Sequence, residues 1–545
     1  MKKTLKTVLA VLLGTMMIMG VLGGCAKEQS GPTSAPTPND AGGESPAPAS
    51  PEPTEEVLTE LTVGLDNDPT SLDPWSATDT LASTIFSTVY EGLLGYDEEN
   101  NIIPVLAQEL PLVEQDATVI TFKLRQGIKF HDGADFNAEA VKLTLERALD
   151  PANGLSRRSL IECIDTVEVI DAYTVRLNLK YSFAPILNAF AHQSCMMLSP
   201  KLIESGEDIS THPAGTGPYV FGEWMDGDHV SVVRNADYWN ADAMARFSSI
   251  KFLPRPEAAT RVAGLQTGEI DVIYPVPSDQ FQLLSTQTGL DVMCEEGNLV
   301  LFFEMNTQKA PFNDVRVRQA FNYAFDNEAF VQVVENGYGV PSTSSMASCD
   351  WGYQAQTMYE YDTEKAKALL AEAGFPDGFS CTLYINTTSK SQKMAEFLQQ
   401  QLALINVDLK IASYEKAQMN EICSARPEES VHDLRCGGWG PSTMEADWAT
   451  RPILTRATWS CDGGSNYSYY TNERVEELIQ IGLSSTDQNE RLAAYAEMQR
   501  IIVEDAPWIF VDTPGVLWAK NSNVQGIYIT ACGQIVLSQG YRTAG

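Results

Sequence analysis

Alternating hydrophobic and polar residues predict β-strands at several places along the chain. Residues 120–125 alternate in this way, which is typical of a strand with one buried face. Two more alternating runs meet around Asp171 and predict a hairpin. Mostly hydrophobic stretches at 298–306 and 508–514 instead predict buried strands.

Hydrophobic residues at helical spacing predict helices between these strands. Ile85, Val89 and Leu93 fall on one face of a helix predicted over 80–94. Asn137, whose side chain can cap a helix, begins another one. Further helices predicted in this way lie at 314–325, 362–374, 393–404, 471–482 and 489–504. Strands and helices in this mixed order over 545 residues predict an α/β fold with two lobes.

The chain is strongly acidic, which narrows the range of partners. Its 72 Asp and Glu residues outnumber its 37 Lys and Arg residues, so the formal net charge is −35. Such a surface repels the phosphates of nucleic acids. The charge therefore excludes nucleic acid as a partner. An acidic surface of this kind is otherwise expected of an exported protein, which it keeps soluble.

The first 24 residues have the pattern of a secretory signal peptide. Three lysines precede a hydrophobic run over 8–22 that is too short to span a membrane comfortably. The run ends in Leu-Gly-Gly followed by Cys25, which resembles the bacterial lipobox, where the chain is cut and the cysteine thiol is lipidated. We therefore expect residues 1–24 to be removed and Cys25 to carry the lipid.

Residues 25–57 are rich in Pro, Ser, Thr, Gly and acidic side chains. Such a segment buries too little hydrophobic surface to fold, so we expect it to be disordered and partly extended. The sequence thus predicts a lipidated tether that holds a folded body, beginning near Leu58, away from a membrane.

The sequence offers no set of residues for catalysis, for a cofactor or for a metal ion. It holds no HExxH, GxSxG or Walker motif and only five histidines. The run GTGPY at 215–219 lacks the third glycine of a dinucleotide site. None of the nine cysteines after Cys25 forms a CxxC pair or stands at zinc spacing from a histidine. We therefore predict a protein that is not an enzyme, in which most of these cysteines are buried. The spacing of the cysteines also allows one or two disulfides and does not indicate their pairing.

Several blocks of sequence carry a family resemblance. The most specific is NTQKAPFNDVRVRQAFNYAFD at 306–326. The others are TSLDP (70–74), VYEGLLGYD (89–97), TFKLRQGIKFHDGADFNAEAV (121–141), GTGPY (215–219), RNADYWN (234–240), YDTEKAKALLAEAGFPDGF (361–379) and SNYSYYTNERVEELI (465–479). In this order they resemble the solute-binding proteins of the peptide/nickel class, family 5, which deliver ligands to ATP-driven importers. The match runs from near Leu58 to the C-terminus.

The resemblance implies a type II, cluster C periplasmic-binding-protein fold, in which two lobes close on a ligand and lobe one carries an extra inserted domain. By analogy, lobe one takes 58–94, 207–300 and 510–545, the inserted domain takes 95–206, and lobe two takes 301–509. Both ends of the folded body then belong to lobe one, so the tether holds that lobe while the other can swing.

The resemblance also implies where the ligand binds. Relatives that bind peptides carry an aspartate shortly after a Gly-Trp pair, where it pairs with the amino terminus of the peptide. Ser442 occupies that position here and offers no charge. Glu445 and Asp447, a few residues further on, either take over this role or lie on a solvated turn.

Other residues are candidates for the cleft. Trp439 lies between glycines and offers a flat face to a ligand. Trp351, in CDWGY, and Ser83, at the start of a helix, resemble pocket positions of relatives. The arginine that dipeptide binders place before the helix at Lys393 is absent, and Lys390 is the nearest basic residue.

Together these features predict an extracytoplasmic, lipid-anchored binding protein that hands its ligand to the permease and ATPase subunits of an ABC importer. An oligopeptide is the leading ligand, because such proteins bind peptides mainly through backbone hydrogen bonds. An oligosaccharide or a nickel chelate stays open, although the arginine that nickel-chelate binders use is absent from 192–200. A sensory or adhesive lipoprotein without a transporter is the alternative function.

Overall fold

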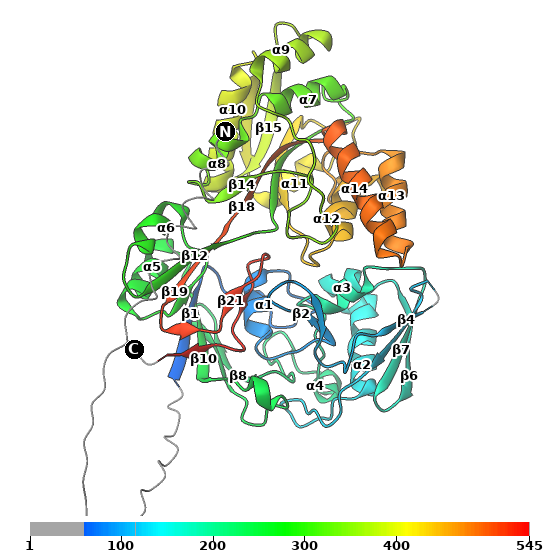
Figure 1. Cartoon of the computed structure of the whole chain (residues 1–545), viewed down its shortest axis with the longest axis vertical. Coiled ribbons are helices and arrows are strands. Elements are labelled where there is room, and N and C mark those ends of the chain that lie inside the picture. The colour runs from blue at the N-terminus through cyan, green and yellow to red at the C-terminus, as the bar shows by residue number, and fades with distance from the viewer. Residues whose placement is uncertain (1–58, 115, 544–545) are drawn as a thin grey trace, which may run out of the picture. The chain divides into compact units, whose positions relative to one another are not determined.

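The computed structural model describes residues 59–114 and 116–543. The predicted signal peptide, Cys25 and the predicted tether lie outside these residues. Two large sheets and a smaller one, each with its own helices, make up most of the described chain (Figure 1). No helix in these two ranges is both long enough and hydrophobic enough to cross a membrane.

The first sheet is built from segments that lie far apart in the sequence. From edge to edge its strands are β12 (Leu290–Glu295), β19 (Val516–Asn521), β11 (Val272–Ile273), β1 (Thr59–Leu65), β10 (Phe247–Pro254), β9 (His229–Arg234) and β8 (Tyr219–Met225). β1 is parallel to both of its neighbours, and the other pairs are antiparallel. Helices α5 (Ala258–Thr267) and α6 (Ser278–Ser285) contribute Val262, Leu265 and Leu284 to a hydrophobic cluster with the sheet.

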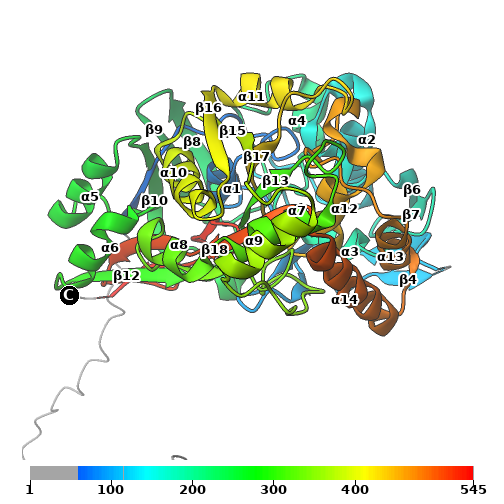
Figure 2. The ribbon, with the colours of Figure 1, turned by 90° about the horizontal axis from the view of Figure 1, so that it is seen from above.

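The second sheet has the strand order β14 (Gly339–Pro341), β18 (Trp508–Pro514), β13 (Val300–Met305), β17 (Leu434–Trp439), β15 (Ser380–Asn386) and β16 (Asp408–Tyr414). β15 is parallel to β16 and β17, and the other pairs are antiparallel. Its helices, visible in Figure 2, are α7 (Val315–Tyr323), α8 (Asn327–Val333), α9 (Thr363–Glu372), α10 (Ser389–Ala403) and α11 (Lys416–Cys423). Phe330 and Phe397 join α8 to α10 with ring centroids 5.4 Å apart, so aromatic packing fixes these helices against each other.

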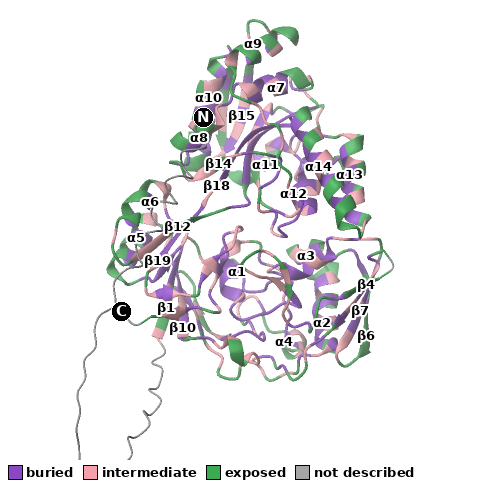
Figure 3. Cartoon of the chain, viewed as in Figure 1, coloured by how far each residue is buried: buried purple, intermediate pink, exposed green. Residues whose placement is uncertain are grey.

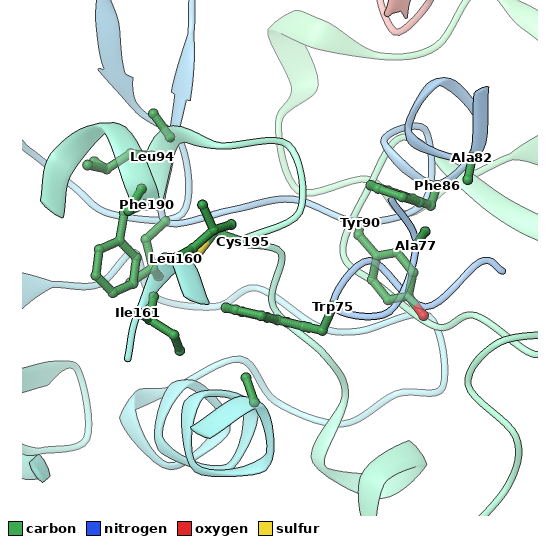
Figure 4. Packing of buried hydrophobic residues seen from close by; sticks show 14 of the residues in the cluster. Trp75, Ala77, Ala82, Phe86, Tyr90, Leu94, Leu160, Ile161, Phe190 and Cys195 are labelled. Carbon is green, nitrogen blue, oxygen red and sulfur yellow. The ribbon is translucent and has the colours of Figure 1, made fainter. Parts of the chain in front are cut away.

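The smaller sheet is antiparallel, with the order β4 (Leu112–Glu114), β5 (Val119–Lys123), β7 (Thr174–Leu179) and β6 (Ile164–Asp171). It packs with α2 (Ala138–Leu149) into a hydrophobic core that continues into the rest of the chain. Figure 4 shows the ring of Trp75 in this core, with Ile161 and Cys195 on one side and Tyr90 on the other. The Trp75 indole N–H donates to the carbonyl oxygen of Met196 over 3.0 Å, which ties the two segments together.

The remaining helices and strands complete the fold. They are α1 (Thr80–Phe86), β2 (Leu94–Tyr96), β3 (Ile102–Pro104), α3 (Ile186–Ala191), α4 (Pro200–Ser205), α12 (Ala446–Leu454), α13 (Glu473–Ser484), α14 (Gln488–Asp505), β20 (Val524–Gln525), β21 (Tyr528–Ile529), β22 (Ile535–Val536) and β23 (Tyr541–Arg542). Figure 3 shows that strands such as β13, β18 and β19 are mostly buried, whereas the outer faces of α5, α9 and α13 are exposed.

The structure confirms most of the predicted elements. The buried strands expected at 298–306 and 508–514 are β13 and β18, and Asn137 caps α2 by accepting the N–H of Ala140. The helix predicted over 80–94 is wrong in length, because α1 ends at Phe86. The hydroxyls of Ser87 and Thr88 donate to backbone oxygens of the preceding turn, an interaction that competes with continued helix.

The nine cysteines in the described residues are all free, so no disulfide is present there. Four of them are buried, four are half-buried, and Cys294 is exposed. Fewer are therefore buried than the sequence analysis predicted.

The described chain crosses between the first and second sheets in two adjacent places. β12 leads into β13 through 296–299, and β18 leads into β19 through Gly515. A Cβ atom on Gly297 would lie 2.6 Å from the carbonyl oxygen of Pro514, and one on Gly515 would lie 2.5 Å from the Sγ atom of Cys294. The crossings thus pack so closely that a side chain has no room at either glycine.

Replacing Gly297 with alanine should force the two crossings apart. The added methyl group meets a backbone oxygen, which cannot rotate away, so we expect the free energy of unfolding to fall by about 1–3 kcal/mol. Denaturant unfolding followed by tryptophan fluorescence measures this loss. Gly95→Ala is the control, because its Cβ would meet only a methyl group of Val105, at 3.1 Å. Equal losses in the two variants would contradict the close packing of the crossings.

Candidate ligand-binding site

The loop that follows β17 begins beside the strand crossings. Trp439, the last residue of β17, pairs with Val300, the first residue of β13. Its side chain is half-buried, and its indole N–H donates to the carbonyl oxygen of Trp448 over 2.7 Å. A Cβ atom on Gly438 would lie 2.8 Å from a methyl group of Leu301, so the glycine beside Trp439 allows the close approach of β13. The loop over 440–445 therefore starts where the two large sheets join.

Three cavities lie in this region, and residues of the loop line two of them. The crossing-side cavity, of about 600 Å³, is lined by residues that include Asn298, Glu335, Lys390, Lys393 and Cys532. The middle cavity, of about 240 Å³, is lined by residues that include Glu91, Met196, Ser442, Met444 and Cys532. The outer cavity, of about 760 Å³, is lined by residues that include Asn188, Trp351, Met444 and Arg491. The crossing-side and outer cavities fall within the usual size of small-ligand sites, about 300–1,000 Å³, and the middle cavity is smaller.

The structure places the sequence-predicted residues differently around these cavities. Ser442 lines the middle cavity and Trp351 lines the outer one. Trp439 and Ser83 line none of the three. Ser83 is buried within α1, where its hydroxyl donates to the carbonyl oxygen of Thr80 over 2.6 Å. A role for each of these residues in ligand binding stays a prediction.

Glu445 is fully buried and has two structural contacts. As the N-cap of α12, it accepts the backbone N–H of Asp447 over 2.8 Å. Its other carboxylate oxygen forms an ion pair with Arg491 of α14. The guanidinium of Arg491 also lies 4.4 Å from the ring centroid of Trp351, a cation–π geometry. Glu445 therefore links α12, α14 and Trp351.

Asp447 is also buried, at 2 % exposure, and it forms an ion pair with Arg451 over 2.7 Å. The suggestion that Glu445 and Asp447 lie on a solvated turn is therefore wrong, because both carboxylates lie inside the protein against arginine partners. Burial raises the pKa of Glu445, while the positive charge of Arg491 opposes the rise and the negative charge of Asp447 adds to it.

The side-chain amide of Asn298 joins several segments around the loop. Its N–H₂ group donates to the carbonyl oxygen of Pro441 over 2.8 Å. The same nitrogen lies 3.2 Å from the sulfur of Met444 and 3.4 Å from that of Cys532. It also lies 3.5 Å from a carboxylate oxygen of Asp350. Asn298 lies within the first crossing, so it connects that crossing to the loop.

Asp350 is a buried acid that the sequence analysis missed. It is 3 % exposed, and its Oδ2 atom has no hydrogen-bond partner in the structure. Burial raises the pKa of Asp350 well above its usual value, and the negative charges of Glu445 and Glu296 add to this effect. Its position in the run CDWGY, directly before the candidate cleft residue Trp351, could have drawn attention to Asp350.

Three of the sequence blocks meet at Glu91. Its carboxylate accepts hydrogen bonds from Thr216 over 2.7 Å, from Tyr238 over 2.6 Å and from Trp239 over 2.8 Å. A Cβ atom on Gly215 would lie 2.2 Å from the carbonyl oxygen of Val89. The run GTGPY is thus part of the packing of the fold, which agrees with its lack of a dinucleotide-site pattern.

Two α/β sheets joined by adjacent crossings, with cavities at the junction, define the class of solute-binding proteins that act outside the cytoplasm. The family model described as bacterial extracellular solute-binding proteins, family 5 middle, matches residues 101–460. The chain belongs to this family, whose members bind solutes for ABC importers and are not enzymes.

Relatives match the chain over most of its length. The glutathione-binding protein GsiB of Pectobacterium atrosepticum is 37% identical over 84% of this chain and 90% of its own. The solved structure of the periplasmic binding protein DppA from Helicobacter pylori, in complex with the peptide STSA, is 27% identical, with a TM-score of 0.75 over 89% of this chain and 98% of that one. The oligopeptide-binding protein AppA of Bacillus subtilis, in complex with a nonapeptide, is 25% identical, with a TM-score of 0.72 over 89% and 99%. The predicted fold class is confirmed.

Replacing Glu445 with glutamine tests its structural role. The change leaves the Arg491 guanidinium buried without its counter-charge, so we expect the free energy of unfolding to fall by about 3 kcal/mol in the absence of ligand. Glu504→Gln is the matched control, because its ion pair with Arg500 is exposed to solvent and should contribute no more than about 1 kcal/mol. If both variants lose equally little, Glu445 does not hold Arg491 in place and is available to a ligand instead. Thermal and denaturant unfolding of the purified variants distinguish the two results.

Proposed function

We propose that this chain captures a short peptide, with glutathione as the first candidate, and delivers it to the permease and ATPase subunits of an ABC importer. The observation that carries the proposal is the 37% identity to the glutathione-binding protein GsiB over nine-tenths of that protein. The peptide complexes of DppA and AppA support a peptide ligand more broadly. The proposal narrows the oligopeptide predicted from the sequence.

The side chains around the loop suit a ligand of this chemistry. Glutathione carries two carboxylates, one ammonium group and one thiol. Lys390 and Lys393 bring positive charge to the crossing-side cavity, and Lys393 is exposed there. Lys390 lies 2.9 Å from Glu335; the lysine side chain is exposed and the glutamate is buried. Lys390 can therefore meet a ligand carboxylate while it keeps Glu335 as its partner. Ser442 and Asn298 add neutral hydrogen-bonding groups near the loop.

The ligand is enclosed by movement of one lobe against the other. The sequence predicts lobe one at 58–94, 207–300 and 510–545 and lobe two at 301–509. Because β18 (Trp508–Pro514) pairs within the second sheet, we move the last boundary from 510 to Gly515 and keep the others. The two crossings at 296–299 and Gly515 are then the segments that absorb the motion, as is usual for hinged domains. The domain at 95–206 moves with lobe one.

We further propose that the protein is anchored to the cell membrane, at its outer face or on the periplasmic side, through a lipid on Cys25. The run Leu-Gly-Gly-Cys supports this, and residues 25–57 act as the tether. Incorporation of a labelled fatty acid in cells measures the modification. We expect the wild-type chain to be labelled and the Cys25→Ser variant to be unlabelled and released from the membrane. Equal labelling of both would contradict the anchor.

Binding of glutathione to the purified protein tests the proposed function. We expect glutathione at about 100 times its Kd to stabilise the fold by about 2.7 kcal/mol, which thermal unfolding detects and titration calorimetry quantifies. The isomeric tripeptide Glu-Cys-Gly, joined through the α-carboxyl group of its glutamate, is the matched control ligand. Tri- to pentapeptides, cello- and chito-oligosaccharides and nickel–histidine complete the panel.

The outcomes separate the candidate ligands. Binding of glutathione but not of its α-linked isomer would support the narrow proposal, whereas equal binding of many tripeptides would support a general peptide binder. Stabilisation by the sugars or by nickel–histidine alone would contradict a peptide ligand.

A further inference from the structure

Two sulfur-containing side chains lie at the boundaries between the three cavities. Cys532 lines both the crossing-side and the middle cavity, and Met444 lines both the middle and the outer cavity. The sulfur atoms of these two residues lie 3.4 Å apart. The pair therefore forms part of the wall between neighbouring cavities.

Backbone contacts hold Met444 in this position. Its N–H donates to the carbonyl oxygen of Pro441 over 3.0 Å, and its carbonyl oxygen accepts the N–H of Trp351 over 2.9 Å. Met444 has a φ angle of 54°, in the left-handed region that residues other than glycine rarely adopt. Strained backbone of this kind is concentrated at ligand sites, where the surroundings enforce it.

A methionine–cysteine contact is suited to a movable partition. Methionine has three rotatable side-chain bonds and a polarizable sulfur, so it changes shape at little cost. Met444 is 5 % exposed, and the polar contacts of its sulfur are with the amide of Asn298 and the thiol of Cys532. Neither contact is a strong hydrogen bond, so the thioether can leave its place without losing one.

We propose that Met444, together with Cys532, forms a partition that determines the length of ligand the protein accepts. This inference rests on the proposed peptide-binding function. The middle cavity, at about 240 Å³, is smaller than a usual ligand site, whereas the other two are large enough. With the partition in place, a ligand of tripeptide size fits within one cavity. A longer peptide has to enter the middle cavity and displace Met444.

Two substitutions of Met444 test the partition. Met444→Gly removes the side chain and fits the left-handed backbone, which offsets part of the cost of losing a buried side chain, so it should join the cavities in a protein that still folds. Met444→Leu is the matched control, because it nearly conserves side-chain volume. Titration calorimetry of wild-type protein and both variants with glutathione and with tri-, tetra- and pentapeptides gives the ratio of pentapeptide to tripeptide affinity. We expect this ratio to rise about tenfold in Met444→Gly and to change by less than about threefold in Met444→Leu.

A second variant and the wild-type control keep the test decisive. Cys532→Ala opens the other side of the partition and should shift the ratio in the same direction, and thermal unfolding confirms that each variant is folded. An unchanged ratio in Met444→Gly, in a protein that binds these peptides, would overturn the partition and leave the proposed function standing. A wild-type protein that binds neither glutathione nor any of the peptides would contradict the proposed function, and with it the selection of peptide length.

Discussion

The close packing of the two strand crossings is the constraint on which the candidate binding region depends. Gly297 lies against the backbone of Pro514, and Gly515 lies against Cys294, so the two connections between the large sheets run side by side with no space for a side chain. The register of β13 with β17 then places Trp439 opposite Val300, just beyond the first crossing. The position of the loop at 440–445 thus follows from backbone packing and strand pairing.

Buried charges and amides hold the other end of this loop. Glu445 caps α12 and pairs with Arg491, which in turn lies over Trp351, so three separate segments depend on one ion pair. Directly before Trp351 in the chain, one carboxylate oxygen of Asp350 has no hydrogen-bond partner. Unpaired buried polar groups cost stability, and natural proteins retain them mainly where binding or catalysis requires them. Asp350 is therefore a buried polar group beside the loop whose retention a role in binding would explain.

The sequence alone predicted the features that are local. Strand alternation, buried runs and helix caps such as Asn137 depend on neighbouring residues, and β13, β18 and α2 appeared as expected. The family blocks gave the class of protein and the fold. The contacts of Glu445 could not be predicted, because Arg491 lies 46 residues away and nothing near either residue indicates the pair. The Met444–Cys532 contact joins residues 88 positions apart and could not be predicted for the same reason. Ser442 showed that the site lacks the aspartate with which relatives bind the amino terminus of a peptide. It did not show which ligand this chain binds instead.

The central claim is that the ligand binds at the junction of the two large sheets, around the loop that follows β17. Hydrogen–deuterium exchange with and without saturating glutathione tests it most directly, because exchange reports local opening of each backbone segment. The account predicts that protection on binding is concentrated at 296–300, 440–447 and 528–534, with little change in α5, α9 or β6. Protection confined to the smaller sheet or to the outer helices, or no protection with glutathione or any tripeptide, would contradict it.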